Sequence, residues 1–187
     1  MATTHFKLLL SIFIAGLVML SVREMHKHLT EESYAKVSNT VASAKADELL
    51  KLLQFDLNRI GLEVNGEPAI VEAKPQRIVF KSDFDLDGHV ETISYYLGDE
   101  LATATQNPKD RILYRVVDDE PAIDVPMGVT RFEISYFSAP VEKPTTELDK
   151  IRTIQVDIIV QNTFTINDKY TSYSRHLRIS PPNLKIN

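Results

Sequence analysis

One uncharged stretch near the N-terminus constrains this chain most. Leu8 to Val22 (LLLSIFIAGLVMLSV) carries no charged side chain, and no other stretch of that length does so. As a helix rising about 1.5 Å per residue it is roughly 22 Å long, whereas the hydrocarbon core of a bilayer is about 30 Å thick. Adding Phe6, with the charges of Lys7 and Arg23 turned toward water, brings the segment to the lower limit for a membrane span.

Residues 1–22 are therefore either a retained signal-anchor or a cleaved secretory signal, whose apolar region reaches about 15 residues. No small-x-small cleavage site follows the run, because the junction reads Met-Leu-Ser-Val-Arg-Glu, and this favours a retained single-pass anchor. The Ala15-Gly16 pair permits close approach of another helix. The residues expected to form the anchor surface are Phe6, Leu8, Leu10, Ala15, Gly16 and Val22.

The orientation and compartment follow from weaker signals. Basic residues flank the run on both sides, so the positive-inside rule gives almost no information on the orientation of the span. The short N-terminal tail is typical of a signal-anchor, and it places the C-terminal domain outside the cytoplasm. The chain has no cysteine, so it has no disulfides or thiol chemistry, which suits a bacterial periplasm. The net charge of -5 argues against nucleic-acid binding.

The rest of the chain has two parts. Residues 23–62 are rich in Ala, Leu, Lys and Glu with apolar residues mostly three or four apart, which predicts an amphipathic helix ending at Gly61. Residues 63–187 carry short β-type runs and form the predicted antiparallel β domain, a meander of about six strands. The fold class expected is α+β, with the long helix laid on one sheet face. The predicted strands are 69–73 (weak), 77–81, 90–97, 111–117, 129–137, 151–160 and 171–179, with solvated loops at 118–126 and 138–150.

Apolar density rises toward the end of the predicted helix, so residues 23–46 are expected to be the more exposed stalk. The second half should pack on the sheet. The helix side of this seam is predicted to consist of Leu49, Leu52, Leu53, Leu57 and Ile60. Their expected partners on the strands are Ile78, Phe80, Ile93, Phe132 and Ile154.

The turn between two predicted strands is acidic. Asp83, Asp85 and Asp87, followed by Gly88, alternate as the first ligands of a calcium loop do. Ser94 stands where such a loop has its bidentate Glu, and no helix pair flanks the turn. Asp and Gly are also favoured in hairpin turns for backbone reasons, so a plain turn is the competing interpretation. Apart from this possible calcium site, the sequence predicts no cofactor.

No catalytic motif is present. The chain lacks a G-x-S-x-G turn, an H-E-x-x-H pair and a Gly-rich phosphate loop, and none of its five histidines stands beside a recognisable nucleophile. We expect no enzymatic activity, no catalytic residues and no small-molecule substrate.

Several segments in order resemble the type IV pilin superfamily, especially PilW-like minor pilins and J-type minor pseudopilins of type II secretion. Leu53 to Leu62 (LQFDLNRIGL) is similar to the close of the pilin-type helix, and Phe80 to Leu97 to the strand, Asp/Gly-rich turn and strand that follow. Leu113 to Arg115, Gly128 to Phe137 and Ile151 to Val160 resemble later strands. The resemblance implies a long N-terminal helix on an antiparallel sheet, and a structural rather than enzymatic role.

The N-terminus departs from that pattern. Prepilins are cut after a Gly and carry a Glu at the fifth mature position, but here His5 precedes Phe6 and Leu10 stands in place of the Glu. The protein is therefore either an atypical unprocessed minor subunit or a pilin-like fold redeployed in another envelope machine, the second being slightly favoured. Both readings predict a single-pass protein of the bacterial inner membrane that docks other membrane-anchored subunits. The alternative is a membrane-tethered sensor or binding module that holds a cation such as calcium.

Overall fold

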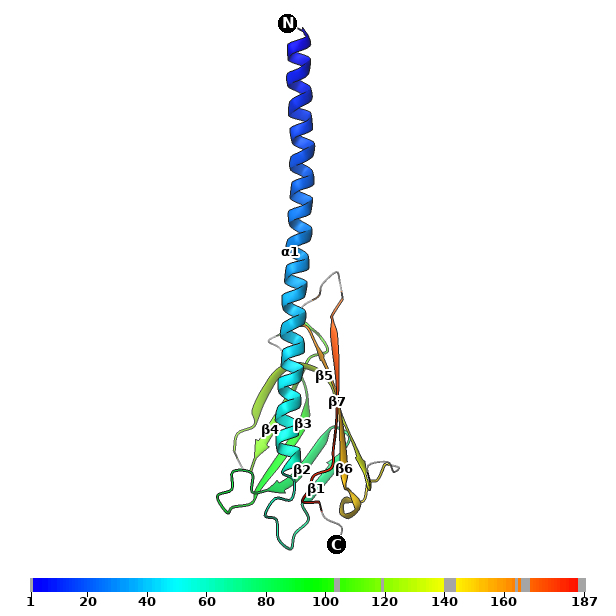
Figure 1. Ribbon diagram of the computed structural model, residues 1–187. Helices are drawn as coiled ribbons and strands as arrows, with labels where there is room; N and C mark the ends of the chain where they lie inside the picture. The colour runs from blue at the N-terminus through cyan, green and yellow to red at the C-terminus, as the bar shows by residue number, and fades with distance from the viewer. Residues whose placement is uncertain are drawn as a thin grey trace. The chain divides into compact units, whose positions relative to one another are not determined.

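The computed structural model describes residues 2–184 except 103, 104, 119, 140–143, 164 and 166–168. The protein has one long N-terminal helix, α1 (Ala2–Asn58), packed on a seven-stranded antiparallel sheet, which confirms the predicted α+β class (Figure 1). The chain divides into two compact units, Met1–Thr40 and Val41–Asn187. The first unit contains only helix, and the second contains the end of α1 and the whole sheet.

Helix α1 ends at Asn58, four residues before the end of the predicted segment 23–62. Between Gly16 and Gly61 the sequence has no Gly or Pro, so nothing interrupts the hydrogen-bond ladder. Gly61 has a φ of +79°, which an L side chain rarely adopts. A Cβ at this position would also lie 3.2 Å from the Cβ of Ala69 and 3.3 Å from Asn183. Gly61 therefore closes the helix where the chain must turn tightly onto the sheet.

The strands follow one another in space in sequence order, so the sheet is a complete antiparallel meander. The seven strands correspond to the seven predicted runs, including the weak one at residues 69–73. A short 3₁₀ helix, η1 (Leu148–Lys150), precedes β6. The strands are β1 (Ile70–Lys74), β2 (Arg77–Ser82), β3 (Glu91–Leu101), β4 (Arg111–Val117), β5 (Ile123–Phe137), β6 (Thr153–Gln161) and β7 (Ser172–Ile179).

The prediction of a loop over residues 118–126 was wrong in its second half. Strand β5 begins at Ile123, and Arg115, Tyr114 and Leu113 of β4 pair with Ile123, Asp124 and Val125. The acidic residues and prolines obscured this strand because both are uncommon in strands. The register shifts between Arg111 and Leu113, so the extended part of β5 is joined to the rest by an irregularity. Of the second predicted loop, residues 140–143 lie outside the described residues.

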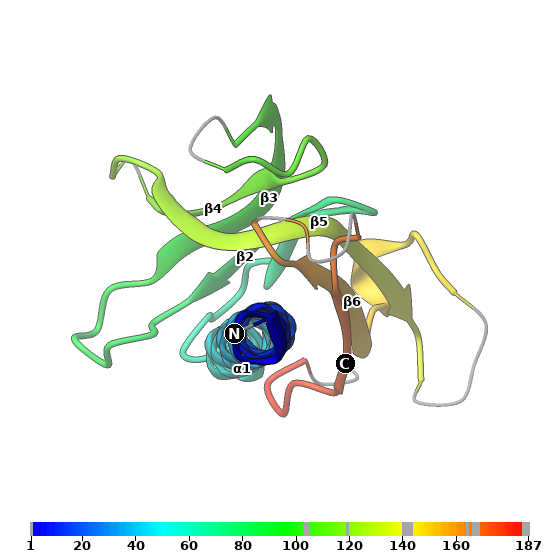
Figure 2. The ribbon, with the colours of Figure 1, turned by 90° about the horizontal axis from the view of Figure 1, so that it is seen from above.

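The sheet is curved rather than flat. Figure 2 shows strands on two sides of the helical segment. The turn after β1 lies against β5, since the amide of Ile134 donates to the Pro75 oxygen at 2.7 Å and the Tyr136 hydroxyl donates to the Lys74 oxygen at 2.9 Å. This curvature lets one helix cover apolar side chains from many strands. The core cluster includes Ile78, Phe80, Ile93, Phe132 and Ile154, all buried.

Burial along α1 begins earlier than the sequence predicted. Ala42 and Ala46 are already buried, although residues 23–46 were expected to form the exposed part. The sheet-packing face of α1 therefore repeats every three or four residues from Ala42 to Leu57.

Candidate functional site

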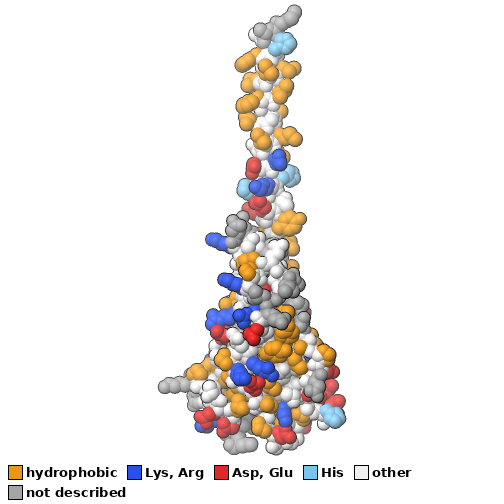
Figure 3. Space-filling view, turned by 180° about the vertical axis from the view of Figure 1, so that it is seen from behind, with side chains coloured by type: hydrophobic (Ala, Val, Ile, Leu, Met, Phe, Trp, Pro, Cys, Tyr) orange, Lys and Arg blue, Asp and Glu red, His pale blue; other side chains and the backbone are white. Residues whose placement is uncertain are grey.

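The N-terminal half of α1 presents apolar side chains to its surroundings. An 18-residue segment of this half has a mean hydropathy of 2.0, and none of it is buried. The predicted anchor residues Phe6, Leu8, Leu10 and Val22 are exposed large hydrophobics, and the helix surface is open at Ala15 and Gly16 as well. Figure 3 shows this apolar section, followed along the helix by charged and His side chains. This helix is long and apolar enough to span a membrane once.

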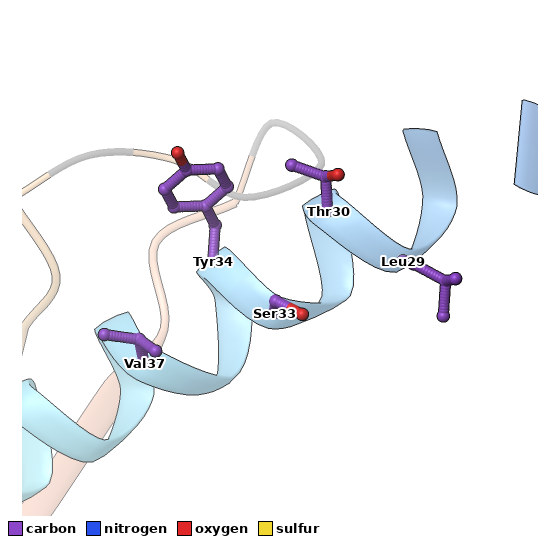
Figure 4. A pocket seen from close by; sticks show the side chains of 5 residues that line it. All are labelled: Leu29, Thr30, Ser33, Tyr34 and Val37. Carbon is purple, nitrogen blue, oxygen red and sulfur yellow. The ribbon is translucent and has the colours of Figure 1, made fainter. Parts of the chain in front are cut away.

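A second exposed apolar surface lies beyond the first charged residues of α1. Leu29, Thr30, Ser33, Tyr34 and Val37 line a shallow hollow on one helix face (Figure 4). Tyr34 and Val37 are 69% and 63% exposed. We call these five residues the stalk face. Its polar members are small, so an apolar partner helix could lie close to the backbone along it.

The predicted seam residues lie at the other end of α1 and in the turn that follows it. Leu49, Leu53, Leu57 and Ile60 are buried and belong to the same apolar cluster as the sheet residues. Leu52 is only half-buried and is not among the core residues, whereas Leu50 packs partly against the cluster. The face that meets the sheet runs through positions 46, 49, 53, 57 and 60, and position 52 lies beside it.

A buried polar network also joins α1 to the sheet. Asp56 is 1% exposed, and its Oδ2 accepts hydrogen bonds from the Tyr95 hydroxyl at 2.6 Å and the Arg115 Nε at 2.7 Å. Burial, and secondarily the negative charge of Asp56, raise the pKa of the Tyr95 phenol. The Arg115 guanidinium lies over the Phe84 ring, 5.6 Å from its centroid. Sequence reasoning placed Asp56 in a family-like motif but missed this network. The available signal was an acidic residue on the apolar face of the helix.

Hydrogen bonds from main-chain amides and from one hydroxyl group join the turn after α1 to β2 and to the residue that follows it. The Gly61 amide donates to the Lys81 oxygen at 2.9 Å, and the Ser82 hydroxyl donates to the Arg59 oxygen at 2.8 Å. The Asp83 amide donates to the Leu62 oxygen at 3.0 Å. Because Asp83 opens the acidic turn, this turn is fixed beside the C-terminal end of the helix.

The structure brings the predicted acidic residues together and adds one. Carboxylate oxygens of Asp83, Asp85, Asp87 and Glu91 all lie within 4.8 Å of one another. Asp83 is buried, whereas Asp85 and Asp87 are exposed. Four carboxylates at this separation offer the hard oxygen ligands that calcium prefers.

The same carboxylates also serve the turn itself. Asp83 accepts from the amides of Asp87 and Gly88 at 3.2 and 3.1 Å, and Asp87 accepts from the His89 amide at 2.8 Å. Glu91 accepts from the Phe84 amide at 3.1 Å. Gly88 has a φ of +93°, as a tight turn requires. The turn residues thus have a structural role that needs no ion.

Comparison with known proteins adds no relative. No family model, no curated protein and no solved structure matches the chain. The layout of a long N-terminal helix over an antiparallel sheet is compatible with a pilin-like fold.

Proposed function

We propose that this protein is a non-enzymatic, membrane-anchored subunit of a bacterial envelope assembly, and that it docks other membrane-anchored subunits through its long helix. The first part of α1 spans the membrane, and the stalk face binds a partner helix. The β domain is the folded body that such a subunit presents to its neighbours.

The exposed stalk face carries this proposal. A bilayer core accommodates about 20 helical residues, so a span that begins near Phe6 ends near Arg23. Leu29, Tyr34 and Val37 then lie in water or among headgroups, yet their side chains are more than half exposed. Burying such apolar surface against a partner contributes about 25 cal/mol per Å². Apolar side chains spaced along one helix face fit another amphipathic helix.

The resemblance to PilW-like minor pilins and J-type pseudopilins supports an assembly role, because those proteins have the same layout. The absence of the cleavage Gly before Phe6, and of a Glu at position 10, favours a redeployed subunit over an ordinary pilus component. The proposed location is the bacterial inner membrane, with the β domain on the periplasmic side. A subunit that is not built into a pilus needs neither the cleavage Gly before Phe6 nor the Glu at position 10.

A site-specific photo-crosslinker tests the docking surface. Placed at Val37 in the full-length protein in native membranes, it should yield a discrete adduct with another membrane protein. The matched control is Glu32, which is exposed and lies about 140° away around the helix, at 3.6 residues per turn. Equal adducts from both positions, or none from Val37, would overturn the stalk face as a docking surface.

The identity of the adduct separates the two assembly readings. Recovery of pilus components or prepilin peptidase with the full-length protein supports an atypical minor pilin. Recovery of a stable complex without either supports redeployment in another machine.

The acidic turn favours one alternative function, a membrane-tethered module that holds a cation. The observation behind it is the convergence of Asp83, Asp85, Asp87 and Glu91 within 4.8 Å. A saturable rise in melting temperature at sub-millimolar calcium, abolished by Asp85→Asn, would support this function. Asp85 is the best position because it is exposed, so its replacement should leave the fold intact. An unchanged melting temperature would show that these carboxylates only stabilise the turn through hydrogen bonds and do not hold calcium.

A further inference from the structure

Asp110 is a buried acid without a hydrogen-bond donor. It immediately precedes β4 and is 0% exposed. Neither of its carboxylate oxygens accepts a hydrogen bond from any residue that the structure describes. A buried ionised carboxylate normally has such partners, because burial removes the water that would otherwise solvate it.

The neighbours of this carboxyl group do not replace that water. A Cβ built on Gly128 would lie 3.8 Å from both carboxylate oxygens and 2.7 Å from the Gln161 main-chain oxygen. Gly128, with a φ of +69°, has no side chain and so offers no side-chain donor to the carboxyl group. The Thr105 hydroxyl makes two long contacts of 3.4 Å, to the Ala102 and Asn107 main-chain oxygens, and its proximity to Asp110 stabilises the ionised form only in part. An acid in such surroundings is better accommodated as a neutral carboxylic acid.

Charged groups compensate only in part. Lys45 of α1 is the charged side chain that acts on Asp110, and it forms no ion pair with Asp110 among the described contacts. Burial raises the pKa of Asp110, while the Thr105 hydroxyl and the Lys45 charge offset some of this rise. The electrostatics and the geometry therefore agree that the folded protein raises the pKa of Asp110.

Asp110 lies at a junction between two connecting segments. Its amide donates to the Asn107 oxygen at 3.2 Å, and its own oxygen accepts from the Ala102 amide at 2.8 Å. The Asn107 side-chain amide in turn donates to the Asn162 oxygen and to the Gln161 side chain, both at 3.1 Å. The turn held by Asp110 thus joins the β3–β4 connection to the start of the β6–β7 connection.

We propose that Asp110 is a proton-operated latch between these two connections. With a proton on its carboxyl group, the side chain stays buried and the Asn107 bonds hold. When the proton leaves, the carboxylate is drawn toward water and toward Lys45, and the turn from Asn107 to Asp110 loosens. The folded form binds the proton more tightly than the unfolded chain, so the latch is strongest at acidic pH and weakens as pH rises.

Hydrogen exchange of the full-length protein in lipid nanodiscs tests the latch. Exchange is measured from pH 4 to 8, corrected for the intrinsic rate, at peptides carrying the amides of Ala102, Asp110 and Asn162. Protection relative to amides of β2 should fall as pH rises, by up to about tenfold for each unit by which folding raises the pKa of Asp110. In Asp110→Asn protection should not depend on pH, whereas the exposed-site control Asp149→Asn should behave as the wild type.

Equal pH profiles in the wild type and Asp110→Asn would overturn the latch. Should Asp110→Asn fail to fold, the wild-type carboxyl resonance of Asp110 decides by carbon NMR. Titration at the ordinary value of about 3.9 counts against the proposal, and titration well above it supports the proposal.

Discussion

Asp56 of α1 and Arg115 of β4, 59 residues apart in sequence, form a buried ion pair with 2.7 Å between Oδ2 and Nε. The Tyr95 hydroxyl completes a triangle, since Arg115 Nε also donates to it at 3.1 Å. The second Asp56 oxygen has no partner among the described residues. The buried Asp56 charge is therefore stabilised through Oδ2 alone, mainly by Arg115.

Replacing Arg115 with Met should destabilise the β domain severely. The substitution replaces the aliphatic stem of Arg115 but removes the guanidinium, which leaves the Asp56 charge buried with only Tyr95 as a partner and costs about 3–5 kcal/mol. Denaturant unfolding of the full-length protein in micelles measures the free energy of unfolding. Arg131→Met is the matched control, because Arg131 pairs with Glu133 at an exposed site and its loss should change stability little.

Adding Asp56→Asn to Arg115→Met should recover part of the lost stability, since the unpaired buried charge is then removed. If Arg115→Met were no more destabilising than Arg131→Met, the buried pair would not hold α1 on the sheet.

Leu53→Ala should also destabilise the domain, by about 2–5 kcal/mol, because Leu53 is buried and its truncation leaves a cavity in the seam. Val37→Ala, on the stalk face, should leave the unfolding free energy nearly unchanged and weaken recovery of the partner from membranes. The two readouts are unfolding and co-purification. Similar melting losses for both variants would place the stalk face inside the domain core and remove it as a docking surface.

The helix, the strand order and most of the core could be predicted from periodicity. Leu49, Leu53, Leu57 and Ile60 recur at helical spacing and lie in the core, because a single face of the helix meets the sheet. Leu52 shows the limit of this reasoning, since three or four residues between apolar positions permit two overlapping faces. Only the packing of the sheet selects one of them.

The polar features could not be predicted in the same way. Asp56, Tyr95 and Arg115 meet only because the registers of β3 and β4 place Tyr95 opposite Arg115, beneath the helix. Asp110 carries no distinctive sequence pattern, and its burial follows from the close approach of β5 at Gly128. Such neighbours depend on strand register, which single-residue patterns do not fix.

The domain should lose stability at alkaline pH. Burial and the Asp56 charge raise the pKa of Tyr95, and burial and the Glu72 charge raise the pKa of Tyr136. Each phenol is held protonated in the folded state, so its contribution is present below the unfolded pKa near 10 and is lost as pH rises further. Melting temperatures from pH 8 to 11.5 measure this loss. Tyr95→Phe should lower stability at pH 8 by about 1.5–3 kcal/mol, through the lost bond to a charged group, but flatten the alkaline decline. An equally steep decline in Tyr95→Phe would assign it to other groups.

The peptide bond between His5 and Phe6 should remain intact in the membrane. By its resemblance to a prepilin N-terminus, Phe6 would correspond to the first mature residue, but His5 stands where such processing requires Gly. The apolar run from Leu8 to Val22 should therefore stay attached to the β domain. Intact mass of the membrane-extracted protein measures this directly, and His5→Gly is the informative variant. A wild-type mass beginning at Phe6 would return the protein to the ordinary pilin pathway, and one beginning near Arg23 would make the apolar run a removed signal. If the His5→Gly variant is cleaved and the wild type is not, His5 is the residue that prevents prepilin processing.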